Sequence, residues 1–268
     1  MNIENNSILN VHLNPEGILR IVLNNPKSHN TLSEKMISSL QQSLDDAASD
    51  EKVRVVIIAA EGSTFSAGHD LKEMKAGRLD PDKGKSYFSK IMLQCSTLMQ
   101  SIVTNPKPII AEVNGTATAA GCQLVASCDL AYASVSARFA TPGVNIGLFC
   151  STPMVALSRS VANKHSMEML LTGEFISSDK AAQIGLINEN VKDDSLQKYV
   201  LEKAIIISQK SKMTLKTGKK AFYKQLELTL SQAYEFASDV MVNNMLKLDA
   251  EEGIDAFLEK RKHSWTDK

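Results

Sequence analysis

The sequence has no excess of charge of either sign and no apolar run of membrane-spanning length. Its 268 residues contain 30 Lys and Arg and 30 Asp and Glu, so the formal net charge is zero. A neutral chain has no overall field that would attract nucleic acid or an anionic membrane surface. A bilayer span needs about 20 consecutive apolar residues. We therefore expect neither a membrane nor a nucleic acid among the partners.

The sequence also has few cysteines and lacks the common cofactor motifs. Its four cysteines form no C-x-x-C pair and have no histidine close by, which disfavours zinc. A disulfide framework is implausible in a chain of this length, so we expect reduced and mostly buried thiols. The phosphate-binding loop, the dinucleotide fingerprint and the G-x-S-x-G elbow are absent. We expect no metal and no cofactor of its own. The cysteines are Cys95, Cys122, Cys128 and Cys150.

The first ten residues lack features of a targeting segment. They contain neither the basic and apolar regions of a secretion signal nor the arginine of a transit peptide. On this ground we expect a cytoplasmic protein.

The remaining pattern indicates an α/β protein. Two strands at 8–13 and 18–23 flank a turn at 14–17, which predicts a hairpin. Up to about residue 145, predicted strands and helices alternate, as in a layered α/β core. From Ser151 onward the pattern is almost wholly helical, and the last 60 or so residues could pack on a neighbouring subunit. Other predicted strands lie at 53–60, 109–113, 130–133 and 138–141, and one helix begins after Ser33.

The stretch 108–124 is the strongest local signal. It contains an apolar strand, a turn at Asn114 and Gly115, and then small residues that lead into a helix from about Gly121. The first N–H groups of a helix have no intrahelical partner and attract negative charge. Such a site suits a phosphate, a carboxylate or a developing oxyanion. The alternative is close packing between strand and helix that merely needs small residues, and this stretch alone leaves both open.

Further short segments follow one another along nearly the whole chain. They lie at 25–32, 65–74, 111–115, 121–124, 128–129, 142–148, 170–174, 182–186 and 257–261. Each is weak alone, but the ordered set resembles the crotonase (enoyl-CoA hydratase/isomerase) superfamily. Two stretches, 117–129 and 139–153, most resemble one subgroup of that family.

The resemblance implies a fold and an assembly. The fold is a crotonase-like spiral of ββα units, expected over residues 1–205, followed by a helical oligomerisation region over 206–268. The expected assembly is a homotrimer, or a dimer of two trimers. The ligand implied is an acyl-CoA or enoyl-CoA thioester, with coenzyme A as part of the substrate rather than as a cofactor.

The resemblance also assigns roles to residues. The N–H groups of His69 and Ala120 would form an oxyanion hole for the thioester oxygen. The imidazole of His69 could be a base, a steric wall or a polar contact. Packing of a helix is the alternative account of Phe257. Contacts to coenzyme A are implied for Lys27, His69, Asp70, Leu71, Lys72, Phe257 and Lys260, the last two on the same or a neighbouring subunit.

The sequence departs from the family at its two catalytic glutamates. Gln123 and Gly143 stand at those positions, and Cys150 and Ser151 stand where some relatives carry an aspartate. Glutamine cannot accept a proton at neutral pH, and glycine has no side chain. Because positioned acid–base groups each contribute about 10²–10⁴-fold, we expect hydration to be weak or absent.

Two hypotheses remain open. One is a nominal enoyl-CoA hydratase/isomerase of fatty acid metabolism whose actual reaction needs only enolate stabilisation, such as decarboxylation. The other is a non-catalytic acyl-CoA binder or a regulator of lipid metabolism. Nucleic-acid binding is disfavoured, because Lys35 is the lone basic residue of the first predicted helix, which also carries Glu34, Asp45 and Asp46.

Overall fold

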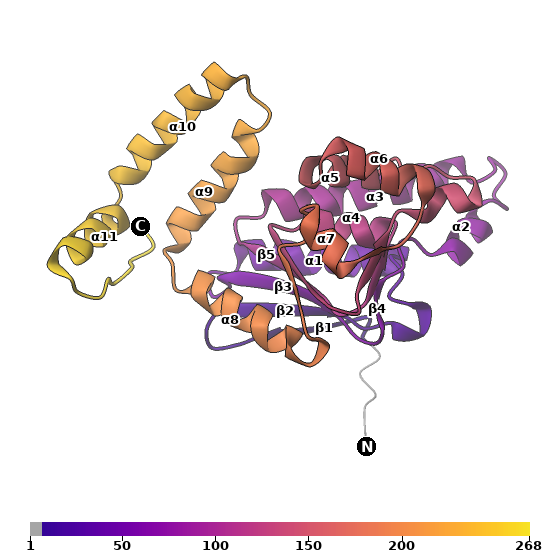
Figure 1. The fold of residues 1–268 in the computed structure, drawn as a ribbon, viewed down its shortest axis with the longest axis horizontal. Coiled ribbons are helices and arrows are strands. Elements are labelled where there is room, and N and C mark those ends of the chain that lie inside the picture. Colours follow the sequence, from indigo (N-terminus) through magenta and orange to yellow (C-terminus); the bar gives the residue numbers. More distant parts are fainter. Residues whose placement is uncertain (1–6) are drawn as a thin grey trace.

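The computed structural model describes residues 7–268, which form two sheets, the helices around them and a projecting C-terminal arm (Figure 1). The larger sheet has six strands in the order β1-β2-β3-β5-β7-β10. The first pair is the antiparallel hairpin that the sequence predicted, and the other neighbours run parallel. The strands are β1 (Leu9–Leu13), β2 (Ile18–Leu23), β3 (Val55–Ala60), β5 (Ile109–Val113), β7 (Leu130–Ser134) and β10 (Glu189–Val191).

A second sheet contains four short strands in the order β4-β6-β8-β9. They are β4 (Thr64–Ser66), β6 (Thr116–Thr118), β8 (Arg138–Ala140) and β9 (Ile176–Ser177). Strands β4, β6 and β8 each follow a strand of the larger sheet and run parallel to one another. This succession of strand pairs and helices repeats along the core. Strands β4, β6 and β9 were not predicted from the sequence, because two or three residues are too few to show a clear alternating pattern.

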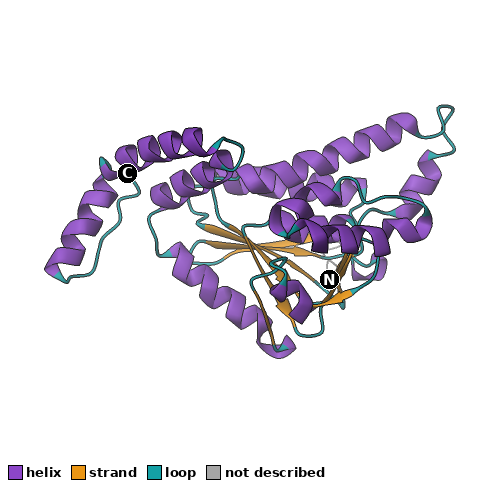
Figure 2. Cartoon of the chain, turned by 45° about the horizontal axis from the view of Figure 1, so that its top comes forward, coloured by secondary structure: helices purple, strands orange, loops and turns teal. Residues whose placement is uncertain are grey.

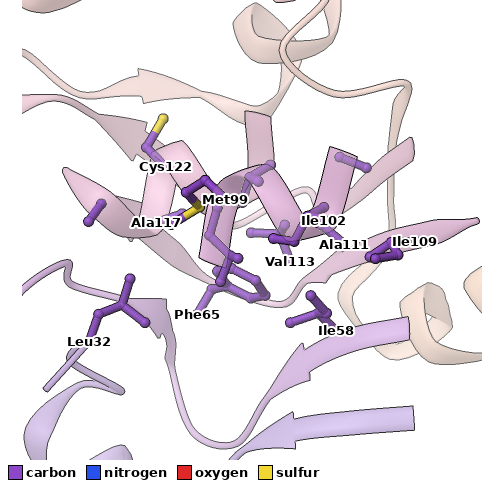
Figure 3. Packing of buried hydrophobic residues seen from close by; sticks show 14 of the residues in the cluster. Leu32, Ile58, Phe65, Met99, Ile102, Ile109, Ala111, Val113, Ala117 and Cys122 are labelled. Atoms are coloured by element: carbon purple, nitrogen blue, oxygen red, sulfur yellow. The ribbon is translucent and has the colours of Figure 1, made fainter. Parts of the chain in front are cut away.

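Helices cover both faces of the larger sheet. On one face, α1 (Glu34–Ser49), α3 (Lys85–Thr104) and α4 (Ala120–Ser127) bury apolar side chains against β3 and β5. Figure 3 shows Phe65, Met99 and Ile58 converging in this core. On the other face, α8 (Leu196–Ser208) packs Val200 and Ala204 against alternate residues of the same strands. The buried run of β3 is therefore explained by its two covered faces.

The remaining elements of the core are short. They are the 3-10 helices η1 (Pro26–Ser28), η2 (Pro142–Ile146) and η3 (Asp193–Ser195) and the helices α2 (Leu71–Gly77), α5 (Pro153–Ser160), α6 (Asn163–Thr172) and α7 (Ser178–Gln183). Serine side chains cap two helices of the core. Ser33 accepts the N–H of Met36, as expected for the start of α1. In α7 the cap is Ser177, whose hydroxyl accepts the N–H of Lys180, while the hydroxyl of Ser178 donates to the Val135 carbonyl.

The C-terminal arm, residues 212–268, projects away from the sheets (Figures 1 and 2). It contains α9 (Lys212–Gln225), α10 (Leu230–Met245) and α11 (Leu248–Glu259). A largely apolar groove of about 570 Å³ lies between α9 and α10. The expected boundary between residues 205 and 206 falls inside α8. Exposed apolar side chains of the arm include Phe222, Leu230, Tyr234, Met241, Leu246, Phe257 and Leu258.

A buried polar cluster joins α9 to the core. The Lys219 ammonium donates to Asp129 Oδ2 at 2.6 Å and to the carbonyls of Ile102 and Lys107. Tyr223 donates its hydroxyl to Asp129 Oδ1 at 2.9 Å. The side chain of Lys219 is therefore buried against the core and does not lie on a solvated helix face. Within residues 7–268, no helix has the length and apolar character needed to cross a membrane.

Candidate functional site

The predicted site residues His69, Ala120 and Gly143 lie just beyond the carboxyl ends of β4, β6 and β8, respectively. These three strands are neighbours and run parallel, so their carboxyl ends meet at one edge of the small sheet. Open α/β sheets commonly bind ligands at such an edge. A Cβ placed on Gly68 would stand 3.1 Å from the nitrogen of Ala120. The structure therefore brings the loop that carries His69 against the start of α4.

Neither predicted donor N–H has an acceptor among the described residues. In the part of the chain that the structure describes, the N–H of His69 donates to no backbone or side-chain acceptor. Ala120 is the first residue of α4, so no preceding helical turn supplies a carbonyl for its N–H. Unpaired N–H groups of this kind are the donors that an oxygen bearing negative charge requires.

The residue before the second donor has an unusual backbone conformation. Ala119 adopts φ 50° and ψ −119°, a region that favours glycine. Strained residues of this kind cost about 1–3 kcal/mol and cluster at functional sites. The N–H of Ala119 donates to the Ala140 carbonyl at 3.0 Å, which fixes this turn to β8. The strained turn sets the direction in which the next N–H, that of Ala120, points.

The side chain of His69 is a neutral polar group at this site. Burial lowers its pKa, and the weaker influence of the Leu32 backbone acts in the opposite direction. Neither ring nitrogen has a hydrogen-bond partner among the described residues. A neutral imidazole offers one donor and one acceptor. His69 can therefore make two hydrogen bonds with a ligand or water.

Gln123 lies in the first turn of α4. It is 5% exposed, and its Oε1 atom has no hydrogen-bond partner within residues 7–268. The nearby Thr141, to which the sequence analysis gave no role, resembles it in this respect: it is 1% exposed and its hydroxyl is also unpaired in that range. Its position directly before Pro142 and Gly143 was the available signal. Buried polar atoms without partners are costly, so both side chains suit contact with a ligand or water.

Gly143 lies in η2 and has no room for a side chain. A Cβ there would stand 2.6 Å from the Leu148 carbonyl oxygen and 2.9 Å from Cys150 Sγ. Burial raises the pKa of the Cys150 thiol, so the thiol is neutral. Glu112, which precedes the site on β5, is paired with Arg20. None of these positions supplies a free carboxylate to the site.

The implied coenzyme A contacts fall into two groups. Lys27 in η1 and Leu71 and Lys72 in α2 are exposed on the segments next to His69, whereas the carboxylate of Asp70 caps α2 by accepting the N–H of Lys72 at 2.8 Å. Phe257 and Lys260 instead lie at the end of α11, and Figure 1 shows α11 and α2 on opposite sides of the molecule. One chain therefore does not bring these two groups together.

Within residues 7–268, no three His, Cys, Asp or Glu side chains cluster in a way that could hold a metal ion. All four cysteines are free; three are buried, and Cys128 is half-buried.

Comparisons with known proteins agree with the observed fold. The family model described as enoyl-CoA hydratase/isomerase matches residues 14–268. The mitochondrial enoyl-CoA hydratase domain-containing protein 3 of Xenopus laevis is 50% identical over 93% of this chain and 83% of its own length. The human protein of that name is 48% identical over 94% and 81%. The 2,3-dehydroadipyl-CoA hydratase of Escherichia coli is 30% identical over 92% and 94%.

Solved structures show the same relationship. The enoyl-CoA hydratase of Mycobacterium smegmatis has a TM-score of 0.92 and 45% identity, covering 97% of this chain and 99% of the other. Human enoyl-CoA hydratase domain-containing protein 3 has a TM-score of 0.91 and 47% identity, covering 97% and 100%. These comparisons confirm the predicted crotonase-like fold. They also confirm the predicted similarity of stretches 117–129 and 139–153 to one subgroup, since the relatives of highest identity named above are enoyl-CoA hydratase domain-containing proteins 3.

The same comparisons correct the expected location. Relatives that are 44–50% identical to this chain carry the word mitochondrial in their names, so the expectation of a cytoplasmic protein is wrong. That expectation rested on the composition of residues 1–10, of which 1–6 lie outside the described residues. Composition of so short a stretch is weak evidence about a compartment.

Proposed function

Because the chain belongs to the enoyl-CoA hydratase/isomerase family, we propose that it binds an acyl-CoA thioester and stabilises the enolate form of that thioester. The thioester oxygen is held between the N–H groups of His69 and Ala120. The observation that carries this proposal is the approach of the two loops, in which a Cβ on Gly68 would lie 3.1 Å from the Ala120 nitrogen. Each donor of such a site contributes about 10²–10³-fold to a reaction that forms an oxyanion.

The chemistry that suits this site needs little proton transfer from the protein. Gln123 and Gly143 replace the acid–base glutamates, and the crowding at Gly143 leaves no space for a carboxylate there. Hydration of a double bond requires both activation of water and protonation of carbon, so it is disfavoured. A decarboxylation forms the enolate by losing carbon dioxide, and it draws mainly on the oxyanion hole.

A second candidate function is a non-catalytic acyl-CoA binder that regulates lipid metabolism. It is favoured by the protonation states of the two titratable side chains at the site. The lowered pKa of His69 and the raised pKa of Cys150 both keep these groups neutral near pH 7, so neither is a strong acid or base there. A pair of backbone donors without a strong acid or base binds a thioester and leaves it unchanged.

We infer that the complete ligand site needs a second copy of the chain. Phe257 is 83% exposed and lies with Lys260 far from the oxyanion loops of its own chain. The C-terminal arm also exposes a series of large apolar side chains, which suits burial against another subunit. A homotrimer, or a pair of trimers, would let α11 of one copy approach the coenzyme A of another. The names of the relatives favour a mitochondrial location.

The test uses crotonyl-CoA with the purified full-length protein, and free coenzyme A as the matched control ligand. Binding is followed by titration calorimetry, and hydration is followed by loss of the ultraviolet absorbance of the conjugated thioester. Saturable binding that is tighter for crotonyl-CoA than for coenzyme A, with little hydration, is the expected result. Absence of saturable binding at millimolar ligand would overturn the proposed site, and rapid hydration would overturn the proposed loss of acid–base catalysis.

A further inference from the structure

We propose that Ser66 and Asn30 are positioning residues that hold the N–H of His69 in the place where it meets the thioester oxygen. This inference rests on the proposed function, because it concerns the first of the two oxyanion donors. Both side chains are fully buried, and each is used completely in hydrogen bonds to segments next to the site.

Asn30 ties three segments together through its side chain. Its Oδ1 atom accepts the N–H of Asn25 at 2.8 Å. Its Nδ2 atom donates to the carbonyls of Glu61 and Thr64 at 2.9 and 2.7 Å. The residue adopts φ 49°, a left-handed conformation that asparagine tolerates better than most residues. Asn30 therefore fixes the start of β4 against the loop that carries the candidate contact Lys27.

Ser66 continues this connection to the oxyanion loop. Its Oγ atom donates to the Asn30 carbonyl at 2.9 Å and accepts the N–H of Gly68 at 3.3 Å. Two backbone bonds run beside it, from Ala67 N–H to the His29 carbonyl at 3.0 Å and from Leu32 N–H to the Gly68 carbonyl at 2.7 Å. Each of the three residues before His69 is therefore tied to the segment 29–32. The first donor follows directly after this fixed stretch.

Ser66 also sets the distance between the two donors. A Cβ on Gly121 would stand 2.2 Å from the Ser66 carbonyl oxygen, so the first turn of α4 packs backbone to backbone on Ser66. Ala120, the second donor, directly precedes Gly121. A shift of Ser66 therefore moves the N–H of His69 relative to that of Ala120. Misplacement by about 1 Å is enough to cost a catalytic site about 10²-fold.

The experiment measures the carbonyl stretching frequency of bound butyryl-CoA labelled with ¹³C at the thioester carbon. Butyryl-CoA has no double bond, so it cannot be hydrated during the measurement. The variants are Ser66→Ala, which removes the bridging hydroxyl, and Asn30→Gly, which removes the amide but suits the positive φ. The control is Ser43→Ala, since the Ser43 hydroxyl donates only to the Ser39 carbonyl of its own helix.

Wild-type protein and Ser43→Ala should lower the carbonyl frequency on binding. Ser66→Ala should lose much of that shift and bind butyryl-CoA about tenfold more weakly, the equivalent of one hydrogen bond, while binding free coenzyme A as wild type does. Asn30→Gly should also lose much of the shift, and it should weaken the binding of free coenzyme A as well, because Asn30 holds the loop that carries Lys27. Folding of each variant is checked by thermal denaturation. One correctly folded variant, either Ser66→Ala or Asn30→Gly, is sufficient to test the positioning role. Full retention of the shift in a folded variant overturns the positioning role. A wild-type protein that binds without any shift overturns the oxyanion-hole proposal itself.

Discussion

The Sγ atom of Cys150 lies 2.9 Å from the position that a Cβ would occupy on Gly143, and the Leu148 carbonyl oxygen lies 2.6 Å from the same position. The thiol and this carbonyl together fill the volume into which a side chain at residue 143 would extend. One substitution therefore cannot restore the second family glutamate without displacing the loop that follows η2. The absence of this glutamate therefore involves the packing of the following loop as well as residue 143 itself.

Gly143→Glu should destabilise the protein by about 1–3 kcal/mol, the usual cost of forcing extra atoms into a packed site. Urea denaturation measures this loss. Gly218→Glu is the matched control, because a Cβ on Gly218 meets no atom within 4 Å. Adding Cys150→Ala should recover part of the loss, since it removes one of the two close contacts. Equal stability of both glutamate variants would show that the loop adapts freely.

Gln123→Glu should raise the rate of crotonyl-CoA hydration by about tenfold or more, because one positioned acid–base group contributes about 10²–10⁴-fold and its partner is still missing. Burial raises the pKa of a carboxyl group, so the gain should increase as the pH rises above neutrality. The absorbance assay at several pH values tests this, with Gln123→Met as a control for altered packing. A folded Gln123→Glu variant without any gain would mean that residue 123 does not contact the reacting carbons.

Much of the fold could be predicted from the sequence, because strands and helix ends are determined largely by residues that are close together in the chain. The apolar run at 109–113 coincides with β5, and the Ser33 cap follows from the chemistry of one hydroxyl and one N–H. The small residues of 115–122 also predicted a close approach of backbones, which the structure shows at Gly121 and Ser66. The family resemblance supplied the order of the segments and hence the spiral.

Other features depend on contacts between distant residues, and no local pattern reveals them. Lys219 lies in a lysine-rich stretch that is typical of an exposed helix face. Its ammonium group is nevertheless buried, because it pairs with Asp129, 90 residues earlier in the sequence. The Cys150 thiol lies close to Gly143 because the chain reverses direction after η2. The distance of Phe257 from His69 depends on the direction of the whole C-terminal arm. That direction is set by the connections between its helices and by their contacts with the core, which no local sequence pattern identifies.

Ala119→Gly should stabilise the protein by about 1 kcal/mol, because it relieves a backbone strain of about 1–3 kcal/mol at the cost of some chain entropy. Ala162→Gly is the control, since Ala162 also precedes a helix but has an ordinary φ of −57°. Urea denaturation should show opposite signs for the two variants. If Ala119→Gly is destabilising to the same degree as the control, the conformation at residue 119 is not strained.

Lys219→Met should cost about 3–5 kcal/mol, because it leaves the carboxylate of Asp129 buried without its cation. Burial lowers the pKa of Lys219 and raises that of Asp129, and the attraction between the two charges acts against both shifts. Lys220→Met, one residue further along α9 and exposed, should change stability little. Chemical denaturation of both variants tests whether the buried polar cluster stabilises the contact between α9 and the core. A mild effect of Lys219→Met would mean that α9 docks on the core mainly through other contacts.

Asp267 ties the end of the chain to the start of the C-terminal arm. Its carboxylate accepts the N–H of Lys212 at 2.7 Å and pairs with Arg54 at 3.2 Å. Although burial acts to raise its pKa, the bonds from Lys212 and Arg54 outweigh burial and lower it. A carboxyl group with a lowered pKa in the folded state stabilises that state at pH values above its unfolded pKa, and this contribution is lost as the pH falls through the folded pKa.

The stability difference between wild type and Asp267→Asn should therefore be constant near neutral pH and should shrink as the pH falls below about 4, near the unfolded value of an aspartate. Asparagine is tolerated at the positive φ of residue 267, so the substitution alters charge rather than backbone. Chemical denaturation across this pH range gives the difference directly, with Asp255→Asn on the exposed face of α11 as the control. A difference that persists unchanged at low pH would show that the ionised carboxylate of Asp267 does not hold the end of the chain against Arg54 and α9.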